Sequence, residues 1–224
     1  WEKACGAVIT SATLTALGNF QRFQMRAGTP PDANYHVVPS PFNFQQATLE
    51  IPSAAVEATN ADVHTLAIID DLPNLIDPEA GTLVLFSSRK QMQEVYEEIP
   101  ADLREIILIQ GDSSKQEMLS QHKQHIDAGR GSVLFGLASF AEGVDLPGNY
   151  CTHVIIAKLP FAVPDDPIEA SLSEWIEARG GNAFMEITVP DASLKLIQAC
   201  GRLLRTETDT GKISLLDRRI ITKR

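Results

Sequence analysis

The 224-residue sequence lacks the motifs that mark a self-contained nucleotide-hydrolysing domain. It contains no G-x-x-x-x-G-K-[ST] phosphate loop, no D-E-x-H string that would hold magnesium and position water, and no G-x-G-x-x-G fingerprint. These absences argue against a complete small α/β nucleotide-binding enzyme.

Cysteines and long apolar runs are also scarce. The three cysteines, Cys5, Cys151 and Cys200, have a spacing that fits neither a disulfide framework nor a C-x-x-C metal site. We therefore expect a reduced, cytoplasmic protein and no metal bound to this chain.

No apolar run approaches the roughly 20 residues that cross a bilayer, and no signal peptide precedes the first apolar segment. These two absences predict no membrane attachment. Because the sequence opens at Trp1 rather than at methionine, we interpret it as an excised fragment.

The net charge of −10 argues against a broad basic face for DNA binding. The charge is uneven, because the segment from Lys195 to Arg224 holds eight basic and three acidic residues, which makes it +5 and the remainder −15. This asymmetry fits a basic site facing a polyanion, and it fits a solvated basic tail equally well. With 44% hydrophobic and 21% charged residues, the chain is expected to form one globular domain with elaborations.

Short apolar runs rich in β-branched residues alternate with segments of helical period. The runs predict buried strands at 4–10, 82–87, 105–110, 132–137, 152–158 and 212–217. The helical periods lie at 89–99, 114–129 and 165–179. This alternation predicts an α/β fold with a mainly parallel sheet, helices on both faces and ligands at the carboxyl ends of the strands.

The region 27–52 differs from the rest, because five prolines interrupt it. We interpret it as an irregular excursion that contains two short β-like pieces, 35–38 and 47–51.

The string QACGRLLR, residues 198–205, carries the most specific polar pattern. Arg202 and Arg205 are three apart in a stretch of helical period that begins after Pro190, which predicts that both lie on one helical face. Together with Gln198 and with Gly201, which permits close approach, two guanidiniums suit a terminal phosphate. A salt-bridged surface helix is the commoner interpretation of such an arginine pair taken alone.

The string SFAEGVDLPG, 139–148, follows a predicted strand and places Gly143 and Asp145 where open α/β sheets bind ligands. Asp145 can accept a hydrogen bond from a ribose hydroxyl or pair with an arginine of 198–205. The plainer interpretation is a glycine turn with a capping aspartate.

Two other predicted strands end in polar residues, LFSSRK at 85–90 and QGDSS at 110–114. Groups at these strand ends can hold the phosphates of a single nucleic acid strand. Ser87 or Ser88, and Ser113 or Ser114, can equally cap the following helices, and both interpretations can hold together. In ITSATL, 9–14, helix capping alone explains the hydroxyl residues.

In their order and spacing, TSATL, LVLFSS, QGD, SFAEGVDLPG and QACGRLLRTETD resemble motifs III, IV, IVa, V and VI of superfamily 2 helicases. The chain is most similar to the bacterial DinG family within the iron–sulfur, XPD-like branch, which also has the D-x-R-L/I-x-T-K string seen here as DRRIITK, 217–223. The resemblance runs from Cys5 to Lys223 and is strongest after Thr82.

The resemblance implies a RecA-like fold of the P-loop NTPase type, with three parts. Residues 1–26 would form the motif III strand and a linker helix at the junction between two motor domains, so this strand can lack support in the fragment. Residues 27–80 would form an irregular lead-in with a helix, and 81–224 the second RecA-like domain.

By the same resemblance, the intact protein would be a monomeric, nucleoid-associated, ATP-dependent 5′–3′ DNA helicase that acts on single-stranded DNA and on forked or hybrid duplexes. ATP and Mg²⁺ would be shared with a first RecA-like domain in cis, and a 4Fe–4S cluster would lie in that other part. The fragment alone would be inactive. A degenerate α/β module that docks a protein partner through its acidic surface is the alternative.

The resemblance also assigns roles to individual residues. Arg205 would be the arginine finger, assisted by Arg202 and Gln198, and nucleotide contacts would come from Gly143, Asp145 and Gly201. The residues that would face the translocating strand are Ser87, Ser88, Arg89, Gln110, Gly111, Ser139 and Phe140. Joint retention of Gln198, Arg202, Arg205 and Asp145 disfavours the docking module, which has no physical need for all four.

Overall fold

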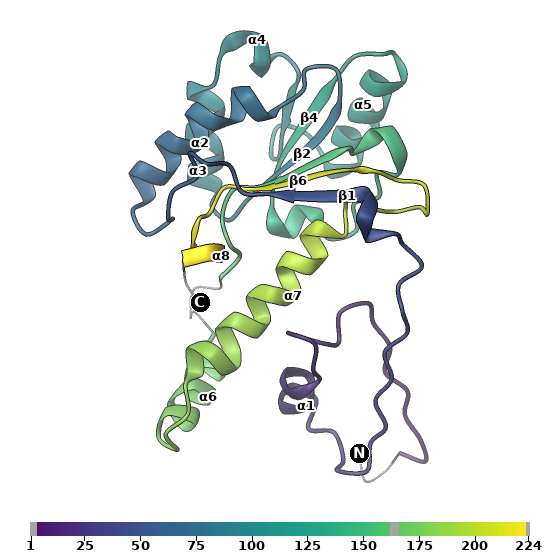
Figure 1. Cartoon of the computed structure of the whole chain (residues 1–224), viewed down its shortest axis with the longest axis vertical. Coiled ribbons are helices and arrows are strands. Elements are labelled where there is room, and N and C mark those ends of the chain that lie inside the picture. The colour runs from purple at the N-terminus through teal and green to yellow at the C-terminus, as the bar shows by residue number, and fades with distance from the viewer. Residues whose placement is uncertain (1–3, 162–165, 223–224) are drawn as a thin grey trace. The chain divides into compact units, whose positions relative to one another are not determined.

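The computed structural model describes residues 4–161 and 166–222 (Figure 1). Two compact units make up the chain. The helical unit comprises the segments up to Pro39 and from Pro160 to Ile197, and the sheet unit comprises Ser40 to Leu159 and the segment from Gln198 onward. None of the described helices is both long and apolar enough to cross a membrane.

The sheet unit contains a six-stranded, wholly parallel sheet in the order β1-β6-β5-β2-β4-β3. The strands are β1 (Ala47–Glu50), β2 (Gly81–Phe86), β3 (Ile107–Ile109), β4 (Ser132–Leu137), β5 (His153–Ile156) and β6 (Gly211–Leu215). In the centre, β2 and β4 pair along their full lengths, from Gly81 opposite Ser132 to Phe86 opposite Leu137. The predicted parallel α/β fold is therefore confirmed.

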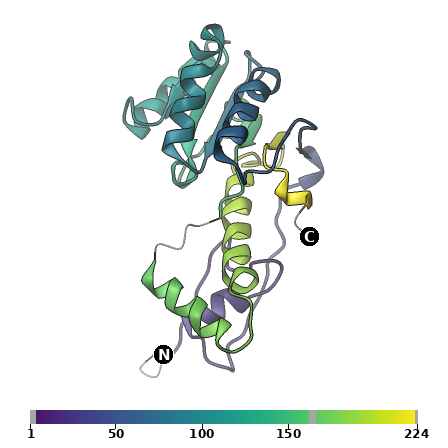
Figure 2. The same ribbon diagram turned by 90° about the vertical axis from the view of Figure 1, so that its left-hand side faces the viewer.

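Helices cover both faces of the sheet. On one face, Val84, Phe86, Val133 and Phe135 belong to the main core, together with residues of helices α2, α3 and α4. These helices are α2 (Ala61–Leu75), α3 (Arg89–Glu98) and α4 (Ala101–Arg104), and α2 and α3 lie side by side in Figures 1 and 2. Because side chains alternate along a strand, Ser132 points to the other face. There it lies 2.9 Å from His122 of α5 (Lys115–Asp127).

Serine and asparagine side chains cap the N-termini of three helices in the sheet unit. Ser88 caps α3 by accepting from the Gln91 N–H, and Ser114 caps α5 by accepting from the Glu117 N–H. Asn60 caps α2 in the same way. The capping interpretation is therefore confirmed for Ser88 and Ser114. The sheet unit also contains the short helical segments η1 (Phe44–Gln46), η2 (Ala138–Ala141), η3 (Gly148–Tyr150) and α8 (Arg219–Thr222).

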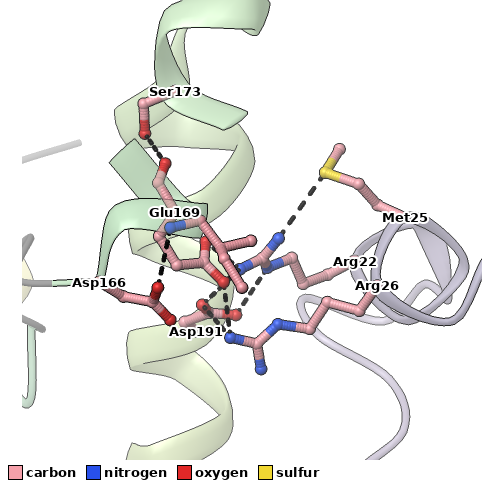
Figure 3. Close-up of polar contacts among 8 residues, drawn as sticks. Arg22, Met25, Arg26, Asp166, Glu169, Ser173 and Asp191 are labelled. Atoms are coloured by element: carbon pink, nitrogen blue, oxygen red, sulfur yellow. Dashed lines mark hydrogen bonds and ion pairs between the residues drawn. The ribbon is translucent and has the colours of Figure 1, made fainter. Parts of the chain in front are cut away.

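The helical unit is organised around a buried arginine. It contains α1 (Gln21–Ala27), α6 (Pro167–Glu177), the π-helical turn η4 (Phe184–Thr188) and α7 (Val189–Cys200) as far as Ile197. Arg22 of α1 is only 3% exposed and donates to Asp191 of α7 and Glu169 of α6 (Figure 3). A small apolar cluster of Ile176, Ala183 and Ile187 completes this unit.

The prediction of a strand at 4–10 is wrong. These residues are exposed and irregular, and no described segment pairs with them. An extended segment without a neighbouring strand leaves its backbone groups to water, so the β-branched side chains of Val8 and Ile9 do not suffice to make a strand.

Of the two β-like pieces predicted within the irregular region 27–52, one forms a strand and the other does not. The β-like piece 47–51 contains β1, the edge strand, whose Leu49 lies opposite Ile213 of β6. The piece 35–38 forms no strand, and Val37 and Val38 are 69% and 85% exposed. The predicted helix at 165–179 appears as α6, although Asp165 lies outside the described residues, as does Lys223 of the terminal string.

Candidate functional site

The loop after β4 presents an exposed glycine and an exposed aspartate between buried anchors. Val144 and Leu146 are 0% and 1% exposed, whereas Gly143 and Asp145 lie at the surface. Gly143 has φ +71°, a left-handed conformation that glycine adopts at little cost. The loop therefore has a fixed path, and its carboxylate faces solvent.

The two arginines of QACGRLLR converge on this loop. Nη1 of Arg202 donates to the Val144 carbonyl at 2.9 Å, and Nη2 of Arg205 donates to the same oxygen at 3.3 Å. Nε of Arg205 lies 3.0 Å from Oδ1 of Asp145. Of the two partners considered for Asp145, a ribose hydroxyl or an arginine, this structure shows the arginine.

The prediction that Arg202 and Arg205 lie on one helical face is wrong, because the helix ends before them. Helix α7 ends at Cys200, and the N–H groups of Arg202 and Leu203 bond to the carbonyls of Ala199 and Cys200, three residues back. The chain turns there because Leu203 and Leu204, 0% and 5% exposed, are buried in the sheet unit. The pair thus comes together in the turn after the helix.

The remaining nucleotide candidates lie next to this turn. Gln198 and Gly201 are exposed, and the Gln198 carbonyl accepts from Nε of Arg202 at 3.3 Å. Burial lowers the pKa of Arg202, and the neighbouring charge of Arg205 lowers it further. A site with two adjacent guanidiniums favours an anion, because an anion relieves their mutual repulsion.

Asp209, which the sequence reasoning missed, holds the backbone of this site. It is 6% exposed and accepts from the N–H groups of Arg205, Thr206 and Gly148 at 2.8, 2.9 and 3.2 Å. Burial alone would raise the pKa of Asp209, but hydrogen bonds from Thr206, Arg205 and Gly148 outweigh it, and the pKa is lowered. The T-x-x-D pattern at 206–209 was the available sequence signal, although by itself it indicates only a turn.

A cavity of about 300 Å³ lies at the carboxyl ends of the adjacent strands β2, β4 and β3. Its lining residues are Arg89, Gln110, Gly111, Ser113, Lys115, Met118, Ser139 and Phe140. Five of the seven residues predicted to face the DNA strand therefore come together here. Ser87 and Ser88 do not line it, and the Ser88 hydroxyl is engaged in capping α3.

Local packing fixes the walls of this cavity. Oε1 of Gln110 accepts from the Leu137 N–H at 2.8 Å and so joins the ends of β3 and β4. Gly111 has φ +121°, and a Cβ there would lie 3.3 Å from Nη1 of Arg89. Phe140 is 3% exposed and packs on Gly136, where a Cβ would lie 2.6 Å from its ring. Its ring is therefore part of the packing and is not free to stack on a base.

The cavity is positively charged on an acidic chain. Arg89 and Lys115 contribute two cations, Ser113 and Ser139 contribute hydroxyls, and no acidic residue is among the described residues that line it. Cations and hydroxyls are the groups that bind phosphate oxygens.

The cysteines occupy separate environments. Cys5 is exposed and Cys151 is buried, and burial raises the pKa of Cys151 to about 12 and that of Cys200 to about 11. Within the described part of the chain, no three His, Cys, Asp or Glu residues gather as metal ligands.

Comparison with known proteins identifies the family of this chain. The profile of the helicase C-terminal domain matches residues 73–224. Over its whole length the chain is 44% identical to the ATP-dependent DNA helicase DinG of Photobacterium profundum and 34% identical to that of Escherichia coli. It spans 33% and 32% of these relatives, about a third of their length.

Solved structures agree in fold. A structure of an XPD helicase superposes with a TM-score of 0.59 at 22% identity, covering 78% of this chain and 32% of that one. The structure of Xpd4 from S. tokodaii gives 0.56 at 16% identity, with coverages of 78% and 34%.

Proposed function

The chain belongs to the helicase C-terminal domain family, and on this premise we propose that it is the second motor domain of an ATP-dependent 5′–3′ DNA helicase of the DinG kind. The observation that carries the proposal is the convergence of Arg202 and Arg205 on the Val144 carbonyl, with Asp145 beside them. A protein-docking module has no use for two adjacent cations held in this way.

In this proposal the first motor domain, outside this chain, supplies the phosphate loop and the groups that hold Mg²⁺. Arg205 reaches the terminal phosphate of ATP when the two motor domains close, and Arg202 and Gln198 assist it. Gly143, Asp145 and Gly201 complete the nucleotide contacts of this domain. The ion pair of Arg205 with Asp145 is exposed, so a phosphate can reach the guanidinium while the carboxylate still orients it through Nε.

The cavity at the ends of β2, β4 and β3 would hold the backbone of single-stranded DNA. Arg89 would contact its phosphates, and Gln110, Gly111 and Ser139 line the cavity through which the strand would pass. Ser87 and Ser88 directly follow β2 and precede Arg89, and the buried Phe140 is one of the lining residues. Alternating closure and opening of the two motor domains would move the strand past this cavity.

The 4Fe–4S cluster implied by the family resemblance is assigned to the part of the intact protein outside this chain. Cys5, Cys151 and Cys200 are an exposed thiol, a buried thiol and a half-buried thiol, and they do not gather as ligands among the described residues. We further propose that the intact protein is a nucleoid-associated monomer that acts on forked and hybrid duplexes, and that the fragment alone does not hydrolyse ATP.

The test is Arg205→Ala in the full-length protein, with ATP hydrolysis measured in the presence and absence of single-stranded DNA. We expect DNA-dependent turnover to fall by roughly 10³-fold or more, because an arginine finger stabilises the charge of the transferred phosphoryl group. Arg130→Ala is the matched control, since Arg130 is exposed and precedes the amino end of β4, whereas the site follows the carboxyl ends of the strands.

Wild-type turnover in Arg205→Ala would overturn the assignment of the finger. The docking alternative predicts something different, namely that even the wild-type protein shows no DNA-dependent hydrolysis.

A further inference from the structure

Lys115, the first residue of α5, connects the cavity to the loop after β4. Its ammonium donates to the Phe140 carbonyl at 2.7 Å and to the Glu142 carbonyl, and it lies 5.1 Å from the centre of the Phe140 ring. The same side chain lines the cavity beside Arg89. Lys115 therefore contacts both the space proposed for DNA and the backbone of the loop.

The loop passes directly from Lys115 to the arginines. The carbonyls of residues 140 and 142 accept from Lys115. The carbonyl of Val144, two residues further along, accepts from both Arg202 and Arg205. The Asp145 carboxylate then pairs with Arg205. Between residues 140 and 145, cations therefore hold four acceptors. Lys115 holds the first two, on the side of the cavity, and the arginines hold the last two, on the side of the proposed nucleotide site.

A phosphate in the cavity would add a further acceptor for the ammonium of Lys115. A hydrogen bond from an ammonium to an anionic phosphate is roughly twice as strong as one to a neutral carbonyl. The carbonyls of Phe140 and Glu142 take two of its three donors, so a phosphate that accepts from the third ties the bound strand to this loop through Lys115. Because Glu142 is two residues from Val144, a change in the hold on this segment alters the position of the acceptors that orient Arg205.

We propose that Lys115 is a positioning residue that couples the binding of a nucleic acid phosphate in the cavity to the placement of Arg205. The inference rests on the proposed function and goes beyond it, since it assigns the coupling to one side chain. Lys115 does not touch the nucleotide in this scheme and acts through the segment from Phe140 to Asp145.

The experiment compares Lys115→Met, which keeps the length but removes the charge, with Lys115→Arg, which keeps the charge and the donors. Lys90→Met is the matched control, because Lys90 is likewise in the first turn of the helix after a strand, but is 82% exposed and forms its ion pair with Glu94 of the same helix. In the full-length protein, single-stranded oligonucleotide is titrated while ATP turnover, the KM for ATP and oligonucleotide affinity by fluorescence anisotropy are measured.

We expect Lys115→Met to lower turnover at saturating oligonucleotide about tenfold, the factor that corresponds to roughly one lost charge-assisted hydrogen bond. The KM for ATP and the DNA-free turnover should stay within about twofold, because the contact acts on the reacting state and not on nucleotide binding. Lys115→Arg should recover most of the stimulated turnover, and Lys90→Met should match the wild type.

Three results would overturn the inference. If Lys115→Met weakens oligonucleotide affinity but reaches full turnover at saturation, the lysine is a phosphate contact only. If DNA-free turnover and thermal stability fall in step with stimulated turnover, its role is structural. If the wild-type protein shows no DNA stimulation, the proposed function itself falls, whereas a stimulated wild type with a fully active Lys115→Met removes only the coupling.

Discussion

Arg205 and Asp145, sixty positions apart in sequence, form an ion pair with 3.0 Å between Nε and Oδ1. The Asp145 side chain is 70% exposed and that of Arg205 is 30% exposed. A pair this open to solvent contributes only about 0–1 kcal/mol to folding. Its value therefore lies in holding the guanidinium in one orientation while the backbone of Arg205 is fixed by Asp209.

Replacing Asp145 by alanine separates orientation from stability. Since the pair contributes so little to folding, the thermal midpoint of Asp145→Ala should stay within about 2 °C of the wild type. DNA-stimulated ATP turnover of the full-length protein should nevertheless fall several-fold, because Arg205 loses the carboxylate that orients it. Calorimetry and a coupled ATPase assay measure the two quantities.

Glu94→Ala is the matched control for Asp145→Ala, since it removes the exposed Lys90–Glu94 pair from the same unit. Both variants lose one surface ion pair, but only one of the pairs includes Arg205. Equal turnover in the two variants would mean that Asp145 has no orienting role.

The sheet was largely predictable because strands buried on both faces have continuous apolar sequences. The runs around Leu83, Leu134 and Val154 are apolar on both faces of their strands, and all three residues are 0% exposed. Serines at the strand ends also indicated where α3 and α5 begin. Local composition was sufficient in these places because each element is buried or capped by its own residues.

Other features depend on contacts that no local pattern contains. Val8 and Ile9 have the composition of a strand but no neighbouring strand among the described residues, whereas Leu49 belongs to a strand because β6 pairs with it. Arg202 and Arg205 meet because α7 ends at Cys200, and not because of helical spacing. Asp209 accepts from Gly148, which is distant from it in sequence, and Lys115 donates to a backbone carbonyl, so their roles are visible only in three dimensions.

Buried histidines should make the stability of the sheet unit depend on pH. His153 is 4% exposed, and its Nε2 lies 2.8 Å from the Ser214 hydroxyl, which donates to Glu50. Burial, together with the charge of Lys212, lowers the pKa of His153 to about 4, and burial also lowers the pKa values of His64 and His122.

A lowered pKa in the folded state means that the unfolded chain binds the proton first as the pH falls. The contribution of His153 to stability is therefore complete above pH about 6.5, its unfolded value, and is lost progressively as the pH falls towards 4. In that range each such histidine lowers the unfolding free energy by up to about 1.4 kcal/mol per pH unit. Urea titrations at pH 7.5, 6 and 5 measure this slope. His153→Gln should make it shallower, and an unchanged slope would contradict a neutral buried His153.

Arg22 should be the residue on which the helical unit most depends. Its guanidinium donates to both oxygens of Asp191 and to Glu169, and thereby joins α1, α6 and α7 (Figure 3). Arg22→Met leaves Asp191 and Glu169 facing each other with one cation fewer, and breaking a buried ion pair from one side costs about 3–5 kcal/mol. We expect amide hydrogen exchange to accelerate in α1 and α6, with little change in β2 and β4.

Arg26→Met distinguishes this effect from a general loss of charge. Arg26 also contacts Glu169, at 2.8 Å, but its side chain is 57% exposed, so its removal should cost only about 0–1 kcal/mol. The triple variant Arg22→Met, Glu169→Gln, Asp191→Asn should recover much of the protection lost in Arg22→Met, because it removes the uncompensated carboxylates. If Arg22→Met and Arg26→Met exchange alike, burial of Arg22 contributes nothing to the helical unit. If the triple variant recovers no protection, the cost of Arg22→Met comes from lost packing and not from unpaired charge.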